Sequence, residues 1–525
     1  MNKIMYIPLD ERPCNYQYPQ LLAKMTELEL LVPQKSILGN MKKPANIDLL
    51  VSWMEQKIEA VSHLLISIDM LVYGGIVPSR LHQLTYETCM ERLSFLRLVK
   101  EKKPNLKIFA FDLIMRVPAY NSSEEEPDYY EEFGEDLFRL GWLYDKRDQS
   151  LLNEQDSMEL KDIEKKIPLE VQQDFLQRRT KNFSVTQEVV NLVEEEIIDY
   201  LIVPLDDNSP FGFSPKEQRE LMHEIAIRNL LDKVNIYPGA DEIGCTLFAR
   251  AFCEIHRYVP EIFIRYSSTK GPFIIPKYED RILSESIKSH IIAAGGIQVN
   301  NEEKNHFILM VHSPAIEQRE MAEASLKVEK RHRSYFSEVN IREFVEALIW
   351  HANKGKLIAI ADVAVSNGAD HLLLQLLEKK DVFDHLISYA GWNTNGNTMG
   401  TVIAHAIITS YHMQDERPAH QGHLQASREF FYLRLVEDWG YQTIVRTNIS
   451  QNILPELDLT PRFLKDQVDQ VTQQVENQLN QFVGEHLSSI KEGKISLHDV
   501  YLPWSRMFEV GFTLKLESQE IIVFY

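Results

Sequence analysis

The chain has 525 residues, of which 44% are hydrophobic and 25% are charged, so it can bury the core of one large domain or of several ordinary ones. Its formal net charge is −21, from 56 basic and 77 acidic residues. Nucleic acids and anionic membranes select for basic surfaces, so this charge argues against both partners. A small-molecule partner is expected, and the oligomeric state stays open, a homo-oligomer included.

The N-terminal sequence at 1–13 lacks the apolar stretch of a secretion signal. No window approaches about 18 uninterrupted apolar residues, so no membrane span is expected. The four cysteines form no CxxC pair, a pattern typical of free thiols in a reducing compartment. We therefore expect a cytoplasmic location.

Short apolar runs alternate with helical patterns over about 400 residues. Runs that are apolar throughout are typical of parallel strands that are buried on both faces. Strands are predicted, in chain order, at 5–9, 29–32, 64–68, 107–113, 200–205, 234–237, 262–266, 307–311, 357–361 and 386–390.

This alternation indicates a parallel α/β sheet with right-handed crossovers. We expect a (β/α)8-type barrel over residues 1–420 with a helical insertion at about 121–196; two tandem doubly wound α/β domains are the alternative. The acidic run at 124–126 in the insertion is typical of a solvated face. Residues 421–525 contain long amphipathic patterns and are predicted to form a C-terminal α-helical domain.

The centre of the predicted site is the strand at 200–205, which ends in Asp206 and Asp207. In α/β proteins, ligands bind at the C-terminal ends of the strands. Two carboxylates placed there can divide the work of catalysis, one protonated as an acid and the other ionised. The alternative is that one of them caps the helix that begins near Ser214.

Polar side chains also follow most of the other predicted strands. Carboxylates, side-chain amides and aromatic rings are the groups that hold neutral polyols such as sugars. Parallel strands present their C-terminal ends to one side, so these residues should converge on one mouth, or on two facing mouths if there are two domains. The predicted substrate-binding residues are Asp10, Arg12, Asp69, Tyr73, Arg116, Glu242, Asp362, Asn367, Asp370, Trp392, Asn393 and Asn397.

Other site chemistries have weaker support in the sequence. Asp10, Asp69, Asp206 and Asp241 could together bind Mg²⁺ or Mn²⁺ through oxygen ligands; otherwise no cofactor is expected. The chain has no GxxxxGK[ST] motif, no GxGxxG after the first strand, no HExxH and no GxSxG. We interpret His312 as structural.

The chain contains several longer distinctive stretches, which are MYIPLDERPCNYQYP, LLISIDMLVYGGIVPSR, VPLDDNSPFG, YPGADEIG, AGWNTNGNTMGT and LPWSRMFEV. Together these stretches resemble a bacterial family of proteins of unknown function, DUF4127. The resemblance spans nearly the whole chain. It implies family membership and brings no activity with it.

The order of the strand-end motifs is also similar to that of glycoside hydrolase family 84, the retaining N-acetylglucosaminidases. That family has a (β/α)8 barrel with an Asp-Asp pair after its fourth strand, which Asp206 and Asp207 match. The resemblance implies substrate-assisted catalysis, in which Asp206 orients the acetamido group and Asp207 is the general acid and then the base.

Later motifs extend this resemblance. Asp362, Asn367 and Asp370 are similar to sugar-binding residues after the family's seventh strand, and Asn393 to a turn after its eighth. The family's N-terminal Gly-rich motif is missing here, and Asn-Ser-Pro follows the Asp-Asp pair in place of an apolar residue. The similarity therefore covers strand ends alone.

Together these features predict a glycoside hydrolase that acts on a small oligosaccharide or glycoside, with Asp206 and Asp207 as the catalytic residues. Retaining N-acetylhexosaminidase activity is the more specific form of this hypothesis. Two alternatives stay open: a metal-dependent hydrolase or lyase that uses the aspartates at the strand ends, and a non-catalytic sugar-binding protein.

Overall fold

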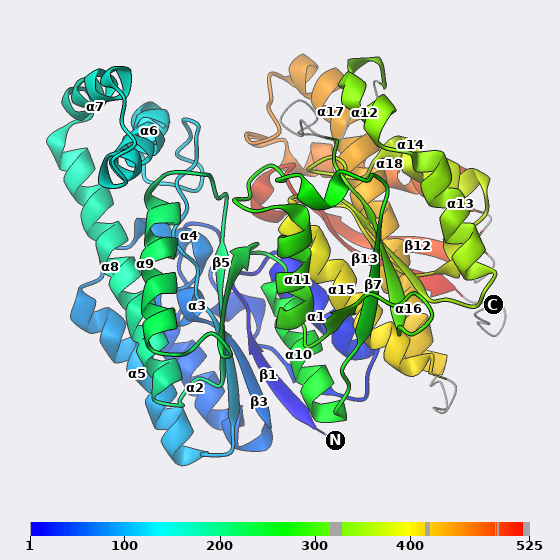
Figure 1. Ribbon diagram of the computed structural model, residues 1–525, viewed down its shortest axis with the longest axis horizontal. Coiled ribbons are helices and arrows are strands. Elements are labelled where there is room, and N and C mark those ends of the chain that lie inside the picture. Colours follow the sequence, from blue (N-terminus) through cyan, green and yellow to red (C-terminus); the bar gives the residue numbers. More distant parts are fainter. Residues whose placement is uncertain (1, 316–327, 415–420, 489, 491–492, 518–525) are drawn as a thin grey trace. The chain divides into compact units, whose positions relative to one another are not determined.

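The fold is given by a computed structural model, which describes residues 2–315, 328–414, 421–488, 490 and 493–517 (Figure 1). Within these ranges, no helix is long and apolar enough to cross a membrane. All four cysteines are buried free thiols. The chain divides into two compact units: unit 1 comprises Met1–Glu11, Leu28–Gly244 and Tyr278–Asp280, and unit 2 comprises Arg12–Glu27, Cys245–Lys277 and Arg281–Tyr525.

Unit 1 is built on a six-stranded parallel sheet with the strand order β2-β1-β3-β4-β5-β6. Its central strands are buried along almost their whole length, as the apolar runs predict. The strands are β1 (Lys3–Ile7), β2 (Glu29–Leu31), β3 (His63–Ser67), β4 (Lys107–Phe111), β5 (Tyr200–Leu205) and β6 (Val234–Pro238).

Helices of unit 1 connect these strands, and Figure 1 shows α5, α8 and α9 side by side. The region at about 121–196 contains α6, α7 and α8. These three helices share a core of their own, which includes Leu137, Leu160 and Phe175. The helices are α2 (Ile47–Lys57), α3 (Ile68–Tyr73), α4 (Ile76–Leu81), α5 (Tyr86–Lys102), α6 (Tyr130–Asp148), α7 (Glu154–Lys166), α8 (Leu169–Glu194) and α9 (Phe213–Ile227).

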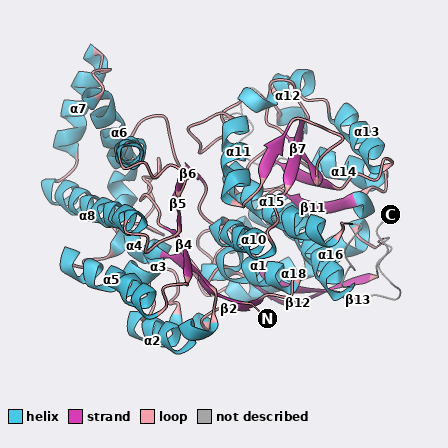
Figure 2. Ribbon diagram, turned by 60° about the horizontal axis from the view of Figure 1, so that its bottom comes forward, coloured by secondary structure: helices cyan, strands magenta, loops and turns pink. Residues whose placement is uncertain are grey.

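Unit 2 contains a five-stranded parallel sheet with the order β11-β10-β9-β7-β8. Figure 2 shows this sheet between α11 on one side and α13 and α14 on the other. The strands are β7 (Glu261–Tyr266), β8 (Ile297–Val299), β9 (Phe307–His312), β10 (Ile358–Asp362) and β11 (Leu386–Ala390).

Most of the remaining helices belong to unit 2, including α1, which follows β1 in the chain. Residues 421–525 are predicted as a helical domain. Their described part contributes three α-helices, an 11-residue π-helix and an antiparallel hairpin of β12 (Lys494–Tyr501) and β13 (Gly511–Glu517) to this unit. The helices are α1 (Pro13–Lys24), α10 (Ile243–His256), α11 (Leu283–Ala293), α12 (Arg333–Glu338), α13 (Ile341–Ala352), α14 (His371–Lys379), α15 (Asn395–His412), α16 (Gln421–Arg434), the π-helix η7 (Leu435–Val445), α17 (Arg446–Asn452) and α18 (Val468–His486).

The predicted (β/α)8-type barrel is wrong, because the strands form two open sheets. In the described part of the chain, β2 and β6 each pair on one side, and so do β8 and β11. Barrel strands and the central strands of an open parallel sheet are both buried on two faces, so their sequences look alike. The observed sheets have the open, doubly wound arrangement that was the alternative.

Numbered within its own unit, each sheet contains the order 2-1-3-4-5, with β6 added at one edge in unit 1. In such sheets the chain reverses direction between the first and third strands, and ligands bind outside the strand ends near that point. The corresponding neighbours are β1 and β3 in unit 1, and β7 and β9 in unit 2. The C-terminal edge of each sheet is therefore where a site is expected.

Candidate functional site

The C-terminal edge of the first sheet carries a row of acidic side chains. Asp10, Asp69 and Asp112 follow β1, β3 and β4, and all three are buried. Asp206 and Asp207 follow β5, and their side chains are 18% and 23% exposed. In this row, these two are therefore the carboxylates that a dissolved ligand can reach.

The turn after β5 fixes the direction of both side chains. Asp207 has a φ of 46°, in the left-handed region that Asp and Asn adopt more readily than most residues. The next backbone N–H, that of Asn208, donates to the carbonyl of Tyr278 at 3.1 Å. Helix α9 has Gly212 at its N-cap, with no side-chain cap. The alternative that Asp206 or Asp207 merely caps this helix is therefore wrong.

Two arginines hold the aspartate pair in place. Arg80 of α4 donates from Nη2 to Asp206 Oδ2 at 2.9 Å, and Arg116 donates from Nη1 to Asp207 Oδ2 at 3.1 Å. The same Arg116 nitrogen lies 3.9 Å from Asp206 Oδ2, so one guanidinium contacts both carboxylates. The side chains of Arg80 and Arg116 are 3% and 10% exposed, so solvent screens these contacts less than surface ion pairs.

Two glutamates bridge the arginines. Glu125 Oε2 accepts hydrogen bonds of 3.0 Å from both, and Glu126 Oε1 accepts from Arg80 at 3.3 Å and from Arg116 at 2.9 Å. The prediction that residues 124–126 form a solvated face is wrong at Glu126, which is 4% exposed. We call the whole set the carboxylate–arginine cluster: Arg80, Arg116, Glu125, Glu126, Asp206 and Asp207.

The electrostatics of the cluster favour proton transfer at Asp207. Burial, followed by the charge of Asp206, raises the pKa of Asp207 to about 6, against the lowering effect of Arg116 and Arg80. A carboxyl group with such a pKa can give up and take back a proton near neutral pH. Because the cluster has more carboxylates than guanidinium groups, it suits a neutral or cationic ligand better than an anion.

A drier acidic pair lies next to the cluster along the sheet edge. Burial raises the pKa of Asp69 to about 6, and burial together with the charge of Asp69 raises that of Asp112. Asp69 Oδ2 accepts from the Leu113 N–H at 3.1 Å, and this bond and the charge of Arg80 partly offset the effect of burial on the pKa of Asp69. Arg80 therefore acts on this pair as well as on the cluster.

Sequence reasoning missed four of these residues for identifiable reasons. The predicted strand at 107–113 runs two residues past the end of β4, so Asp112 falls within the predicted strand and not after it. Glu125 and Glu126 have the sequence pattern of a surface run. Arg80 follows a glycine pair at 74–75, and that loop signal could have marked it as a side chain near the sheet edge.

The other predicted residues of unit 1 lie at the same sheet edge or next to it. Asp10 and Asp241 are buried, and Glu242 Oε2 accepts from the Ala240 N–H at 2.9 Å. Tyr73 closes α3. Across the described ranges, no group of three or more His, Cys, Asp or Glu side chains is placed to hold a metal ion. The Mg²⁺ or Mn²⁺ alternative therefore gains no support from the geometry.

The C-terminal edge of the second sheet holds a separate polar cluster around Asp370. Arg331 donates to both of its carboxylate oxygens, at 2.8 and 2.9 Å, and His312 Nε2 lies 2.9 Å from Oδ2. The Tyr335 hydroxyl also donates to Asp370. Although burial opposes it, these bonds with His312 and Arg331 hold the pKa of Asp370 well below its usual range. Asp370 is fully buried, which indicates a structural role for it.

Asp362 lies beside this cluster, opposite His312 in the register of β9 and β10. Its Oδ2 accepts from the Asp370 N–H at 2.7 Å and from the Tyr389 hydroxyl at 3.1 Å. Burial raises the pKa of Asp362 to about 6. Its Oδ1 is buried and has no hydrogen-bond partner among the described residues. Asp362 is therefore kept neutral more easily than a surface aspartate.

The remaining predicted residues belong to unit 2 and mostly stabilise turns. The N–H of Asn367 donates to the carbonyl of Asn393 at 2.8 Å, and both residues have positive φ angles. Trp392 donates from Nε1 to Thr401 at 3.2 Å, and Asn397 lies buried in the first turn of α15. Arg12 donates to Glu509 at 2.9 Å, and its guanidinium lies over the Trp504 ring. The predicted residues thus divide between the two units.

Comparison with known proteins identifies the family and nothing further. The family model described as a protein of unknown function, DUF4127, matches residues 4–513. The chain therefore belongs to this family, as its motifs predict. No curated protein matches the chain. The similarity to glycoside hydrolase family 84 is not supported, and the barrel on which it depended is absent from the described sheets.

Proposed function

We propose that this member of the DUF4127 family is a hydrolase of O-glycosyl bonds and that Asp207 is its general acid and base. The observation that carries the proposal is the partly exposed Asp206–Asp207 pair, held by Arg80 and Arg116 at the C-terminal end of β5. Its support comes from geometry and charge and does not depend on a barrel.

The proposed reaction uses the two aspartates differently. Protonated Asp207 donates its proton to the glycosidic oxygen as the bond from that oxygen to the anomeric carbon breaks. Positive charge then develops on the sugar ring, and the excess carboxylates of the cluster stabilise it. Water adds to the anomeric carbon, and its proton returns to Asp207. Asp206, fixed by its hydrogen bond with Arg80, supplies the nearest negative charge.

Neutral glycosides are the substrate class that this charge pattern favours. A phosphorylated or carboxylated sugar would bring its own negative charge against Glu125, Glu126 and Asp206. Hydroxyl groups, in contrast, can donate to these carboxylates. N-acetylhexosaminides belong to the neutral class, so the more specific hypothesis remains part of the proposal.

The proposal is tested by assaying the purified protein against nitrophenyl hexosides and nitrophenyl N-acetylhexosaminides. We expect turnover of at least one neutral glycoside, and a loss of about 10²- to 10⁴-fold in Asp207→Asn, the range of general acid catalysis. Activity should fall as the pH rises through about 6, because Asp207 then loses its proton.

Asp199→Asn is the matched control. Asp199 precedes β5, whereas Asp206 and Asp207 follow it, and its carboxylate pairs with Lys100 at 2.8 Å and Lys107 at 2.9 Å. This variant should keep wild-type turnover. Inactivity of the wild type on every glycoside, or full activity of Asp207→Asn, would refute the proposal.

A non-catalytic sugar-binding protein is a second candidate, because the partly exposed carboxylates of the cluster can accept hydrogen bonds from sugar hydroxyl groups whether or not the sugar is turned over. Calorimetry separates the two candidates on the same glycosides: binding without any turnover supports the binding protein and contradicts the hydrolase.

A further inference from the structure

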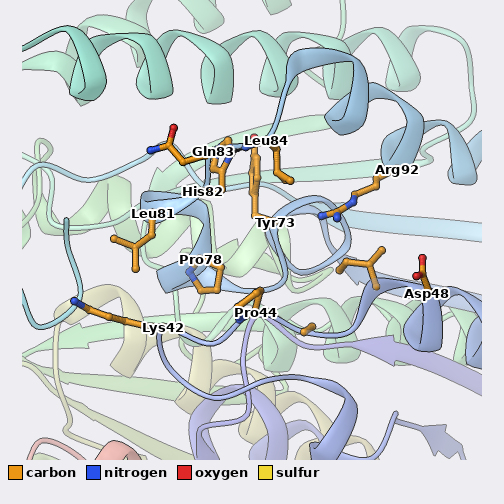
Figure 3. Close-up of a pocket in the computed structure, with 12 residues that line it drawn as sticks. Lys42, Pro44, Asp48, Tyr73, Pro78, Leu81, His82, Gln83, Leu84 and Arg92 are labelled. Carbon is orange, nitrogen blue, oxygen red and sulfur yellow. Dashed lines mark hydrogen bonds between the residues drawn. The ribbon is translucent and has the colours of Figure 1, made fainter. Parts of the chain in front are cut away.

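Unit 1 contains a pocket of about 360 Å³ (Figure 3). Its walls come from the segment at 42–48, from the end of α3, from α4 with the residues after it, and from Arg92 of α5. Pro44, Ile47, Pro78 and Leu81 give it apolar surface. The volume is at the low end of the range for small-molecule sites, so the pocket suits a ligand of one or two rings.

Gly74 fixes one wall of this pocket. It ends α3 with a φ of +91°, and its carbonyl accepts from the Ala45 N–H at 3.0 Å. A Cβ at this position would lie 2.7 Å from that nitrogen and 2.8 Å from the Pro44 Cβ. The wall at 44–45 can therefore approach α3 because residue 74 has no side chain.

An aromatic pair forms another part of the lining. The rings of Tyr73 and His82 stack with their centroids 4.5 Å apart and an angle of 26° between their planes. Both nitrogens of His82 are occupied: Nδ1 accepts from the Leu84 N–H, and Nε2 lies 2.8 Å from Asn182 Oδ1. Burial lowers the pKa of His82 to about 4. His82 therefore offers a neutral ring surface and not a charge.

Arg92 and Lys42 are the basic residues in the lining of the pocket. Arg92 extends from α5 toward the turn that carries Tyr73 and donates to the Val72 carbonyl (Figure 3). Among the described residues, this half-buried guanidinium has no carboxylate within ion-pair distance. Arg97, on the same helix, pairs with two glutamates at 2.8 and 2.9 Å. Arg92 thus retains the ability to bind an anion.

We propose that this pocket binds a flat, apolar monoanion such as an aromatic carboxylate. The apolar walls and the Tyr73–His82 rings take the ring system, and Arg92 takes the carboxylate by charge-assisted hydrogen bonds. Lys42 also lines the pocket, but it lies 3.8 Å from Asp128, and Asp48 is on the same segment, so Arg92 supplies the main attraction for the anion. The site is separate from the carboxylate–arginine cluster, and its binding test does not depend on glycosidase activity.

The test is calorimetric titration of the full-length protein with 2-naphthoate and, separately, with its neutral amide. We expect 2-naphthoate to bind at least tenfold more tightly than 2-naphthamide. Arg92→Met should weaken naphthoate binding at least tenfold. Arg97→Met is the matched control, since it removes the same group from the same helix outside the pocket lining, and it should bind like the wild type.

A second variant fills the space without changing a charge. Leu81→Trp should abolish binding of 2-naphthoate, because the indole occupies the volume of the ligand. The wild-type comparison of naphthoate with naphthamide needs no variant and so holds even if one misfolds. The proposal is overturned if 2-naphthoate does not bind at millimolar concentration, if the amide binds equally well, or if a folded Arg92→Met binds like the wild type.

Discussion

Arg80→Met removes one of the two cations from the carboxylate–arginine cluster and provides the sharpest test of its energetics. Arg80 contacts Asp206, Glu125 and Glu126 at 2.9, 3.0 and 3.3 Å. Methionine keeps the apolar stem of the side chain and removes the charge. The variant therefore leaves the four carboxylates of the cluster with Arg116 as its remaining cation.

The expected cost at pH 7.5 is about 3–5 kcal/mol, the range for breaking a buried ion pair by removing one partner. Glu126 is the main reason, because it is 4% exposed and burial already raises its pKa. Without Arg80 its pKa should rise further. A carboxyl whose folded-state pKa is raised contributes stability below its unfolded pKa and loses it as the pH rises through the folded value. The cost should therefore be smaller at pH 5.5.

Hydrogen exchange of β5 amides, corrected for intrinsic rates at each pH, measures this local free energy. Arg97→Met is the control: its pairs with Glu188 and Glu195 are partly exposed, and its loss should cost no more than about 1 kcal/mol at either pH. A cost of Arg80→Met that is no larger than that of Arg97→Met, or that is the same at both pH values, would contradict this prediction.

Further predictions concern other buried groups and are measured by the same exchange method. Asp69→Asn should stabilise unit 1 by up to about 3 kcal/mol at pH 8 and leave it unchanged at pH 4, since the pKa of Asp69 is about 6. Gly74→Ala should cost more than about 1 kcal/mol, through its positive φ and the close Ala45 nitrogen, and should weaken 2-naphthoate binding. Asp370→Asn should cost about 3–5 kcal/mol in unit 2 and nothing in unit 1, since it breaks the buried pair with Arg331.

The sequence is sufficient to locate the strands and the acidic residues at their ends. The run at 200–205 is apolar throughout, and a polar turn follows it. The sequence alone therefore predicts both β5 and the position of Asp206 and Asp207 directly after it. Arg116 is predictable for the same reason, because it follows β4 closely. These features depend on local composition, which each segment of the chain carries by itself.

Pairing between distant segments is not readable in the same way. A barrel would require one continuous sheet in which β6 pairs with β7, whereas the observed strands form two separate sheets. The apolar content of these strands is compatible with either arrangement. Glu126 illustrates a second limit: its burial follows from the positions of Arg80 and Arg116, 46 and 10 residues away in the chain. A charged run stays exposed to solvent unless the fold brings residues of opposite charge next to it, and the sequence of the run itself does not show whether this happens.

Helix α4 explains why the two proposed sites of unit 1 occupy neighbouring positions in the sequence. Pro78 and Leu81 are three residues apart, so they share one side of this six-residue helix, and both line the pocket. Arg80 lies between them in the sequence and donates to Asp206. A ligand that packs against Pro78 and Leu81 thus contacts the same short helix that positions Arg80 in the cluster. Arg80 lowers the pKa of Asp207. A ligand in the pocket that shifted Arg80 would therefore change the pKa of Asp207, and with it the rate of the proposed proton transfer.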